Sequence, residues 1–302
     1  MNKKIFILIP VHNNLEYTKN CINSLFLQDY SNFKIVLIDD GSSDGTSDFV
    51  AKHYPSVKIL NGDGTLWWTA SINLGLNYAL SVAATDDFIL TLNNDLEVDS
   101  NYLSSLLEVY ELYKPCLVGS TSVYIDNQDQ IDFLGKKWNP YLAKTRMSIN
   151  LNSYNELVKN FDVIETDLIT GRGTLFPVAI AKQIGNYDDY HFPQYIADYD
   201  YGLRANKLGY KSIIASKAKV KSVVKNTGLN YKLRKVNYLE FLKSFFSIKS
   251  PIQLRARFYW AKLHSPIGIL SFILDFLRII VSFHRHLFLS RLNNYNDENF
   301  SK

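Results

Sequence analysis

The sequence predicts an α/β protein with a mostly parallel, twisted sheet flanked by helices, followed by a C-terminal helical extension. Over the first hundred residues, short apolar runs alternate with amphipathic stretches, which is typical of β-α-β units and a parallel sheet. The residues after 228 lack this alternation and are rich in basic and aromatic side chains. We therefore expect one domain over residues 1–228 and a basic, amphipathic helical tail over residues 229–302.

The individual elements follow from the apolar periodicity. Runs of apolar residues predict strands over 4–10, 33–38, 57–60, 88–92 and 117–123. Helices are expected over 15–26, 47–53, 70–83 and 195–209. The polar and aromatic stretch 126–142 predicts a loop or a small hairpin, and the tail predicts helices over 238–246, 251–264 and 267–283.

Polar side chains crowd the carboxyl ends of the predicted strands. The run 88–92 stops at Asn93, Asn94 and Asp95, and the run 33–38 stops at Asp39 and Asp40. In open parallel sheets, ligands bind at the carboxyl ends of the strands. Carboxylate and amide oxygens there suit a hard cation such as Mg²⁺ or Mn²⁺, held together with substrate phosphates. Asn and Asp also favour turns and helix caps, so a purely local role is the competing interpretation.

Several classes of protein are disfavoured by what the sequence lacks. No GxGxxG follows the first apolar run and no GxxxxGK[ST] occurs, so neither a dinucleotide site nor a P-loop is predicted. Cys21 and Cys116 have no metal-binding spacing, and two isolated cysteines favour a reducing, cytoplasmic compartment. No uninterrupted apolar stretch reaches the about 20 residues that a transmembrane helix needs.

Positive charge is concentrated at the C-terminal end. Residues 217–302 carry 16 Lys and Arg against 4 Asp and Glu, whereas the whole chain has a net charge of only +4. Basic, aromatic flanks beside apolar helix faces suit a helix that lies in the interface of an anionic membrane. No nucleic-acid-binding motif is present, so we expect no nucleic-acid partner. The alternative is a tail that packs on the sheet or on a second subunit as a homodimer.

Several short motifs carry a family resemblance. They are IPVHNN at 9–14, IDDGSSDGT at 38–46, GDGTLWW at 62–68, NLG at 73–75 and LNND at 92–95. In this order and spacing they resemble the family-2 glycosyltransferases with a GT-A fold, especially bacterial rhamnosyltransferase-like enzymes of surface-polysaccharide assembly. Further matches are TGRGTLF at 170–176, GNYD at 185–188 and DYDYGLR at 198–204, so the resemblance covers roughly residues 4–228.

The resemblance implies an inverting hexosyltransferase with a divalent metal, Mg²⁺ or Mn²⁺. Its donor would be a UDP- or dTDP-sugar. Its acceptor would be a hydroxyl of a growing, lipid-linked glycan in polysaccharide, capsule, O-antigen or lipopolysaccharide biosynthesis. The enzyme would then work peripherally, on the inner face of the cell membrane.

The resemblance also implies residue roles on the donor side. Asp39 matches the acid that pairs with the uracil or thymine ring, and a carboxylate can accept from the ring N3–H. Asp95 is the carboxylate at the metal position, where the ion would neutralise the leaving nucleoside diphosphate. The expected donor-binding residues are Pro10, Val11, Asn13, Asp39, Asp40, Asp63, Trp67, Asn73, Asn94 and Asp95.

On the acceptor side, Asp198 matches the general base that removes the proton of the attacking hydroxyl. The supporting residues are expected to be Gly171, Arg172, Asp200 and Arg204. Arg172 is equally suited to a phosphate or to an acidic side chain, since arginine pairs readily with both.

The chain departs from the family pattern at two points. Ala197 stands where the family has a glutamate, and the stretch 218–222 lacks the histidine that often completes the metal site. Either the metal has fewer protein ligands, or Lys221 or Lys225 supplies positive charge at the diphosphate.

Two rival functions remain for a domain of this kind. A sugar-nucleotide-forming nucleotidyltransferase would carry a Gly-rich loop with Arg or Lys after the first strand, which Val11–Asn14 lacks. A non-catalytic nucleotide-sugar or membrane-binding scaffold would not need both Asp95 and Asp198. Hydrolysis of a nucleotide sugar by the purified protein would separate these possibilities.

Overall fold

The chain forms two compact units in a computed structural model, which describes residues 3–223 and 237–300, with side chains as far as residue 288. The first unit comprises Met1–Lys137 and Arg146–Val224. The second comprises Trp138–Thr145 and Lys225–Lys302. The predicted start of the tail, residue 229, lies outside the described residues. The sequence did not indicate that 138–145 joins the tail.

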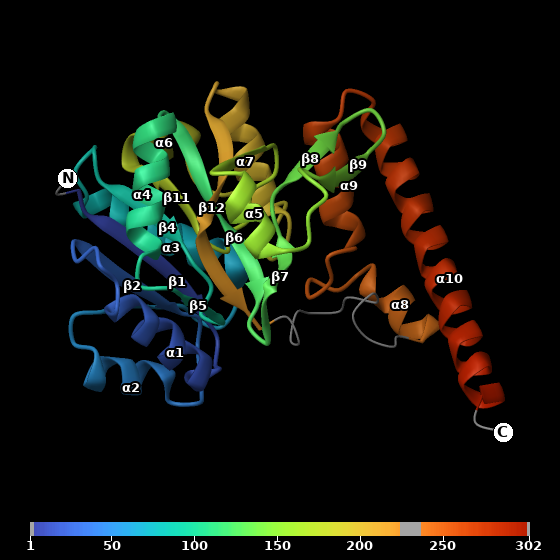
Figure 1. The fold of residues 1–302 in the computed structure, drawn as a ribbon, viewed down its shortest axis with the longest axis horizontal. Helices are drawn as coiled ribbons and strands as arrows, with labels where there is room; N and C mark the ends of the chain where they lie inside the picture. The colour runs from blue at the N-terminus through green and yellow to red at the C-terminus, as the bar shows by residue number, and fades with distance from the viewer. Residues whose placement is uncertain (1–2, 224–236, 301–302) are drawn as a thin grey trace. The chain divides into compact units, whose positions relative to one another are not determined.

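The secondary-structure elements are drawn in Figure 1. The helices of the first unit are α1 (Leu15–Phe26), α2 (Thr46–His53), α3 (Trp67–Val82), α4 (Tyr102–Tyr113), α5 (Tyr154–Asn160), α6 (Val178–Ile184) and α7 (Ala197–Lys207). The strands of its sheet are β1 (Ile5–Val11), β2 (Phe33–Asp39), β3 (Lys58–Asn61), β4 (Phe88–Thr91), β5 (Leu96–Val98), β6 (Cys116–Tyr124), β7 (Asn127–Phe133), β10 (Val163–Thr166), β11 (Thr174–Pro177) and β12 (Lys211–Ser222). The second unit has helices α8 (Tyr238–Ser244), α9 (Leu254–His264) and α10 (Gly268–Phe300). Strands β8 (Lys136–Asn139) and β9 (Lys144–Met147) pair separately, and the turn between them belongs to the second unit.

The large sheet has the strand order β10-β12-β6-β11-β4-β1-β2-β3. Strands β3, β2, β1 and β4 are all parallel, as the sequence predicts. Beyond β4 the sheet becomes mixed, because β11 runs antiparallel to both β4 and β6. Strand β12 is again parallel to β6. The predicted α/β sheet flanked by helices, with helices at the C-terminal end, is confirmed.

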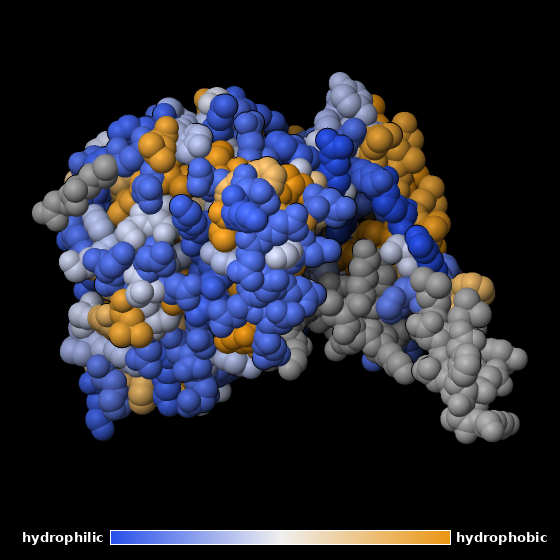
Figure 2. All heavy atoms as spheres, in the orientation of Figure 1, coloured by the Kyte–Doolittle hydropathy of each residue, from blue (hydrophilic) through white to orange (hydrophobic). Residues whose placement is uncertain are grey.

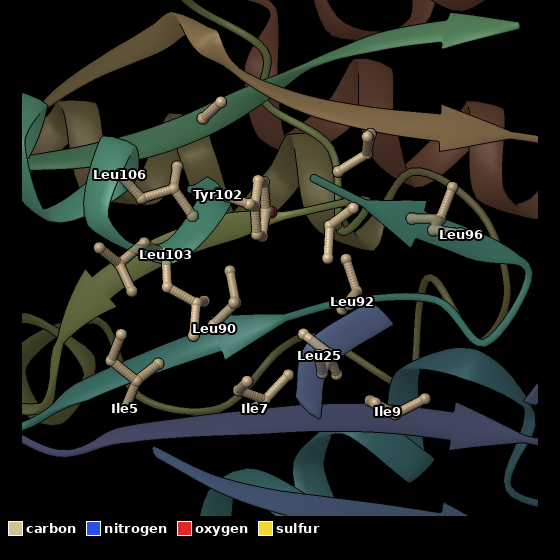
Figure 3. Packing of buried hydrophobic residues seen from close by; sticks show 14 of the residues in the cluster. Ile5, Ile7, Ile9, Leu25, Leu90, Leu92, Leu96, Tyr102, Leu103 and Leu106 are labelled. Carbon is tan, nitrogen blue, oxygen red and sulfur yellow. The ribbon is translucent and has the colours of Figure 1, made fainter. Parts of the chain in front are cut away.

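One face of the sheet packs against α1, α2 and α4. The side chains of Ile5, Ile7 and Ile9 alternate along β1 and meet Leu25 of α1 and Leu103 of α4 in one buried cluster (Figure 3). Burying side chains of this size stabilises the fold by about 1.5–3 kcal/mol each. The period-2 pattern of β1 therefore fixes which of its residues face this core.

Helices α3 and α7 cover the opposite face. Gly75 of α3 lies against Ile38 and Leu8, which alternate with the residues of the first core. In α7, the ring of Tyr201 lies 5.3 Å from that of Phe176 in β11. This packing brings the amino ends of both helices to the edge of the sheet formed by the carboxyl ends of the parallel strands.

The antiparallel insertion of β11 shapes that edge. Thr174, the first residue of β11, pairs with Thr91, the last residue of β4, and the Gly173 N–H donates to the Thr91 carbonyl at 2.9 Å. Strand β5 pairs with the end of β12, with Leu96 opposite Ser222. The segments 93–95, 170–173 and the end of β12 are therefore neighbours, although they lie far apart in the sequence.

The second unit has its own aromatic core. The rings of Phe241 and Phe283 stack at 3.7 Å, and Phe245 packs beside them. Trp138, in the turn 138–145, lies 5.2 Å from Trp260 and donates its indole N–H to the His264 carbonyl at 3.1 Å. The tail therefore packs on a hairpin turn contributed from the middle of the chain. Among the described residues, no helix has the length and hydropathy needed to span a bilayer.

Candidate functional site

The turn after β4 is held by two amide side chains. Asn93 accepts a hydrogen bond on Oδ1 from the indole N–H of Trp68 at 2.9 Å. Asn94 donates from Nδ2 to the hydroxyl of Thr18 in α1 at 3.0 Å. The Asn93 oxygen and the Asn94 amide are therefore used within the protein. The amide of Asn94 is thus anchored to α1, and its expected contact with the donor stays a prediction.

Asp95 differs from its two neighbours. Its Oδ1 atom is buried and has no hydrogen-bond partner among the described side chains and backbone groups. Burial raises the pKa of Asp95, and the positive charge of Arg172 opposes that rise. An unpaired buried carboxylate oxygen is costly, so a group that binds it would be favoured. A divalent cation is such a group.

Asp198 lies in the first turn of α7. Its Oδ2 accepts from the Gly171 N–H at 3.1 Å, and its Oδ1 accepts from the Tyr199 N–H at 2.9 Å. Burial raises the pKa of Asp198, whereas these two bonds and the charge of Arg172 lower it. The amino end of a helix also favours a negative charge. Asp198 is thus a half-buried carboxylate whose ionised form is partly stabilised.

The residue before α7 has an unusual backbone. Ile196 adopts φ 76°, in the left-handed region. A β-branched residue there costs on the order of 1–3 kcal/mol, and such outliers cluster at functional sites. The strained position directly precedes the helix turn that carries Asp198.

Arg172 links the two carboxylates electrostatically. Its Nη1 donates to Asp132 Oδ2 at 2.6 Å, and the guanidinium lies 5.8 Å from the Phe133 ring. Its charge lowers the pKa of both Asp95 and Asp198. Of the two roles that the sequence left open for Arg172, pairing with an acid is the one found. Asp95 follows β4, Arg172 precedes β11, and Asp198 lies in the first turn of α7.

Asp39 ends β2 and is almost fully buried. Its Oδ1 accepts from the Ser42 N–H at 2.8 Å, and its Oδ2 accepts from the Ser47 hydroxyl. Each carboxylate oxygen has further lone-pair capacity, so one more donor can bind. The geometry is compatible with the expected contact to a pyrimidine ring, which stays a prediction.

Asp40 positions the amino end of α3. Its Oδ1 accepts from the Gly64 N–H at 2.8 Å and its Oδ2 from the Trp67 N–H at 3.0 Å. Trp67 itself has φ 59°. Asp40 therefore joins the end of β2 to the loop that leads into α3, and both of its carboxylate oxygens are engaged there.

The other residues expected on the donor side lie at the same edge of the sheet. Pro10 and Val11 are buried at the end of β1. Asn13 donates its backbone N–H to Ser42 Oγ at 2.7 Å. Asp63 is solvent-exposed, and hydrogen bonds from Thr65 lower its pKa. These loops meet at the ends of β1, β2 and β3, as the parallel register requires.

Asn73, expected on the donor side, and Asp200 and Arg204, expected to support the acceptor side, have partners within the protein. The Asn73 amide donates to the Tyr187 carbonyl at 2.9 Å and accepts from the Tyr187 N–H at 2.8 Å, which ties the loop before α7 to α3. Arg204 donates to Asp200 Oδ2 at 2.8 Å and to the Ile184 carbonyl at 2.9 Å. Asp200 and Arg204 therefore hold α7 against the end of α6, and Asn73 is buried.

Lys221, one of the two lysines that could supply positive charge in place of a metal, is paired with an acid. Lys221 lies 2.6 Å from Asp99 Oδ1, and Lys219 lies 3.1 Å from Asp99 Oδ2. Both lysines thus pair with one carboxylate. Lys225 lies outside the described residues.

Two residues of the site, Gln194 and Asp132, were missed by sequence reasoning, and the pair Trp67-Trp68 left open whether its rings belong to the core or to the donor pocket. Trp68 bonds to Asn93 and, through its backbone N–H, to Gln194 Oε1 at 2.9 Å. The paired tryptophans were a visible signal, but they do not indicate which ring faces the site. Asp132 gave no signal, because it lies in a stretch that predicts only a loop or hairpin.

Within residues 3–223 and 237–288, no group of three His, Cys, Asp or Glu side chains is arranged to hold a metal ion. Asp95 would therefore be the main protein ligand of any cation here. Mg²⁺ is commonly held by one or two carboxylates together with substrate phosphates and waters. The free Oδ1 of Asp95 fits such a site.

Comparison with known proteins shows that this chain is similar to glycosyltransferases. The glycosyltransferase GlyA of Streptococcus pneumoniae is 20% identical over 190 residues, which are 61% of this chain and 26% of that protein. The N-acetylglucosaminyl-diphospho-decaprenol L-rhamnosyltransferase of Mycobacterium tuberculosis is 22% identical over 202 residues, 62% of this chain and 65% of that protein. The chain thus spans about a quarter of the length of GlyA.

Among solved structures, GalNAc-T7 with UDP, GalNAc and Mn²⁺ superposes with a TM-score of 0.58 at 13% identity, over 73% of this chain and 43% of that one. At this identity the likeness concerns the fold alone, and it agrees with a GT-A fold. The model of the family described as "Glycosyl transferase family 2" matches residues 6–185, more than half of the chain. The chain belongs to glycosyl transferase family 2.

Proposed function

We propose that this chain transfers a hexose from a UDP- or dTDP-sugar to a hydroxyl of a growing glycan, with inversion at the anomeric carbon. The supporting observations are the free Oδ1 of Asp95 and the Asp198 carboxylate, which is held by the N–H of Gly171, the residue before Arg172. One edge of the sheet thus holds an unpartnered carboxylate and a half-buried carboxylate beside the same arginine. A transferase needs these two functions close together, one at the leaving group and one at the attacking hydroxyl.

In this proposal, Asp198 removes the proton of the acceptor hydroxyl. The hydroxyl oxygen then forms a bond to the anomeric carbon from the side opposite the nucleotide. The bond from that carbon to the diphosphate oxygen breaks, and the nucleoside diphosphate leaves with the bonding electrons. A positioned general base of this kind contributes about 10²–10⁴ in rate.

Asp95 would hold a divalent cation, Mg²⁺ or Mn²⁺, through its free oxygen. When bound, the ion supplies charge neutralisation at the departing diphosphate. Arg172, held by Asp132, favours the ionised forms of Asp95 and Asp198 and so opposes the rise in pKa that burial causes at both. Asp39 and the loop around Asn13 are proposed to contact the nucleoside.

The experiment that tests this function is incubation of the purified protein with UDP- and dTDP-sugars and a divalent metal. We expect free nucleoside diphosphate to appear, with water or an added glycan as acceptor. A nucleotide-binding scaffold would bind the same sugars and leave them intact. The absence of any turnover across the panel, with acceptor glycans supplied, would contradict the proposal.

The acceptor is proposed to be a lipid-linked glycan of a polysaccharide such as capsule or O-antigen, presented at the inner face of the cell membrane. Helix α10 supports this proposal. Large apolar side chains form one exposed stripe along it: Ile269, Leu270, Ile273, Leu277, Val281 and Phe288. Hydrophobic residues gather along α10 in Figure 2. The opposite side of the same helix packs into the core through Ile279 and Phe283.

Positive charge borders this α10 stripe. Arg278 and Arg285 are exposed and lie along one side of it at helical spacing, and the Arg278 guanidinium also donates to the Leu142 and Ala143 carbonyls. A helix that is apolar on its outer side and flanked by arginines suits the interface of an anionic bilayer. Each Lys or Arg near such a surface adds about 1 kcal/mol, and salt screens this term. Insertion of apolar side chains is not screened.

We therefore expect the double substitution Leu277→Gln and Val281→Gln to weaken binding to phosphatidylglycerol vesicles. Each of these exposed side chains would contribute up to about 1.5–3 kcal/mol on insertion into the bilayer, so losing both should lower binding at least tenfold. Vesicle flotation at low and high salt measures the effect. High salt should weaken wild-type binding without removing it.

The matched control is Leu112→Gln, since Leu112 is 72% exposed on α4 in the first unit. This variant should float like wild type. If the α10 variant also floats like wild type, or if wild type ignores anionic vesicles and forms a dimer that the variant lacks, the membrane proposal is wrong.

A further inference from the structure

We infer that Trp68 is a positioning residue that fixes the metal-side turn Asn93–Asp95 and the general base Asp198 relative to each other. The inference rests on the proposed roles of Asp95 and Asp198. It adds to the proposed function one residue that contacts both the turn carrying Asp95 and the backbone that binds Asp198. Trp68 is the second residue of α3 and belongs to neither catalytic segment.

The connection to the metal side is a hydrogen bond. The Trp68 indole N–H donates to Asn93 Oδ1 at 2.9 Å, two residues before Asp95. On its other side, Asn94 is anchored to Thr18. Two side chains, Trp68 and Thr18, therefore hold the turn Asn93–Asp95. Of these two, Trp68 also contacts Gly171, whose N–H binds Asp198.

The connection to the base side is a close packing contact. A Cβ atom built on Gly171 would lie 2.0 Å from Trp68 Cζ2 and 2.5 Å from Cη2. The indole ring therefore lies directly against the Gly171 backbone. The Gly171 N–H in turn donates to Asp198 Oδ2 at 3.1 Å. The position of the ring thus limits where this donor, and with it the carboxylate, can lie.

A third contact joins Trp68 to the chain before α7. Its backbone N–H donates to Gln194 Oε1 at 2.9 Å, two residues before the strained Ile196. The neighbouring Thr69 N–H donates to the Pro193 carbonyl at 3.0 Å. The amino end of α3 therefore holds both the backbone that leads into α7 and the donor to Asp198.

Simple core packing is the competing role for Trp68, whose ring also makes an edge contact with Tyr187 at 5.7 Å. The two roles differ in what they require. Packing needs a ring of similar volume, whereas positioning needs the indole N–H toward Asn93 and the absence of a side chain at Gly171. Gly171 is not in the left-handed region, so alanine there is excluded by the ring and not by backbone strain.

The test is a pair of compensating substitutions. Gly171→Ala should displace the ring or the base and lower kcat by about 10- to 100-fold, because a shift of about 1 Å from productive geometry has effects of this size. Trp68→Phe removes the two carbons nearest to the new methyl group. We expect the double variant to have a higher kcat and a higher melting temperature than Gly171→Ala alone.

Trp68→Phe by itself should act mainly on the metal side, because it removes the donor to Asn93. We expect the affinity for UDP in the presence of Mn²⁺ to fall about threefold to tenfold, consistent with one lost hydrogen bond of about 1 kcal/mol. Calorimetry measures this without turnover. The donor KM should rise while kcat changes less than in Gly171→Ala.

Gly75→Ala is the matched control. Its new methyl group would lie 2.7 Å from Ile38 Cδ1, so it crowds α3 without touching the site. Trp68→Phe should not restore the stability of this variant. The assays use the nucleotide sugar of the UDP and dTDP panel that wild type turns over fastest.

The inference is overturned if Gly171→Ala keeps wild-type kcat, or if Trp68→Phe lowers its kcat further instead of restoring it. It is equally overturned if Trp68→Phe leaves UDP affinity unchanged. Failure of the proposed function has a different signature, since wild type itself would then release no nucleoside diphosphate from any sugar of the panel. The melting-temperature comparison and the UDP titration test the role of Trp68 even if no sugar is transferred.

Discussion

Asp198→Asn is expected to lower transfer by about 10²–10⁴-fold, the contribution of a positioned general base. The substitution preserves the size of the side chain and removes its ability to take a proton. Because the hydrogen bonds that Asp198 accepts come from the backbone of Gly171 and Tyr199, nucleotide binding should stay within a few-fold of wild type. Initial rates of nucleoside diphosphate release and calorimetry with UDP measure the two properties separately.

Asp200→Asn is the control, because it removes a negative charge from the same helix, α7, without changing the proposed base. Asp200 is buried and paired with Arg204 at 2.8 Å. Its substitution should lower the melting temperature, because it leaves Arg204 without its acid, and should lower kcat much less. If Asp198→Asn turns over near the wild-type rate, Asp198 is not the base.

The pH dependence of activity is a second test of Asp198 as the general base. Burial raises the pKa of Asp198 above the value of about 3.9 for an exposed aspartate. Since the base must be ionised, activity should fall on the acid side at a higher pH than for an ordinary carboxylate. The residual activity of Asp198→Asn should lack this acid limb. A limb unchanged by the substitution would have to come from another group.

Asp95→Ala is expected to abolish the metal-dependent part of nucleotide binding and most of the turnover. The free Oδ1 of Asp95 is the proposed attachment point of the cation, and the ion contributes several kcal/mol at the leaving diphosphate. UDP affinity should fall at least tenfold in Mn²⁺. In a chelator, the variant and wild type should bind UDP equally weakly.

Asp99→Ala serves as the control for this prediction. Asp99 is another acid near the same turn, but it pairs with Lys219 and Lys221. Its removal should leave the dependence on Mn²⁺ intact. Equal UDP affinity of wild type in Mn²⁺ and in chelator would contradict the metal role and would return Lys221 to consideration as the source of positive charge.

The parallel half of the fold was predictable because its signals are local. Apolar runs such as Ile5–Val11 alternate with amphipathic helices, and the runs 33–38, 57–60 and 88–92 are each followed at once by Asn or Asp. Parallel pairing then brings the ends of β1, β2 and β4 to one edge, so Asp39 and Asp95 could be placed together from the sequence alone.

The mixed half was not predictable in the same way. The antiparallel placement of β11 depends on pairing between residues far apart in the sequence, such as Thr174 with Thr91. The partner of Arg172 comes from β7, where Asp132 has no distinguishing neighbours. A local pattern does not specify such contacts, and the same holds for the turn 138–145 that packs with the tail.

Side-chain roles were harder to predict than side-chain locations. Asn73 lies near the expected region, yet its amide is used on the backbone of Tyr187. Trp68 was visible as half of a tryptophan pair, yet its importance follows from the packing on Gly171 and the bond to Asn93. Hydrogen-bond satisfaction is a property of the folded environment, so sequence type alone does not distinguish a ligand contact from an internal anchor.

The most direct measurement of the central claim is ³¹P and ¹H NMR of wild-type protein incubated with Mg²⁺ and UDP-glucose, UDP-N-acetylglucosamine or dTDP-L-rhamnose. We predict that at least one nucleoside diphosphate signal grows, because the bond between the anomeric carbon and the diphosphate breaks, and that the first sugar product has the inverted anomeric configuration. Asp198→Asn should slow both signals together. Release of a nucleoside monophosphate with a sugar 1-phosphate, or a product with retained configuration, would contradict an inverting glycosyl transfer at this site.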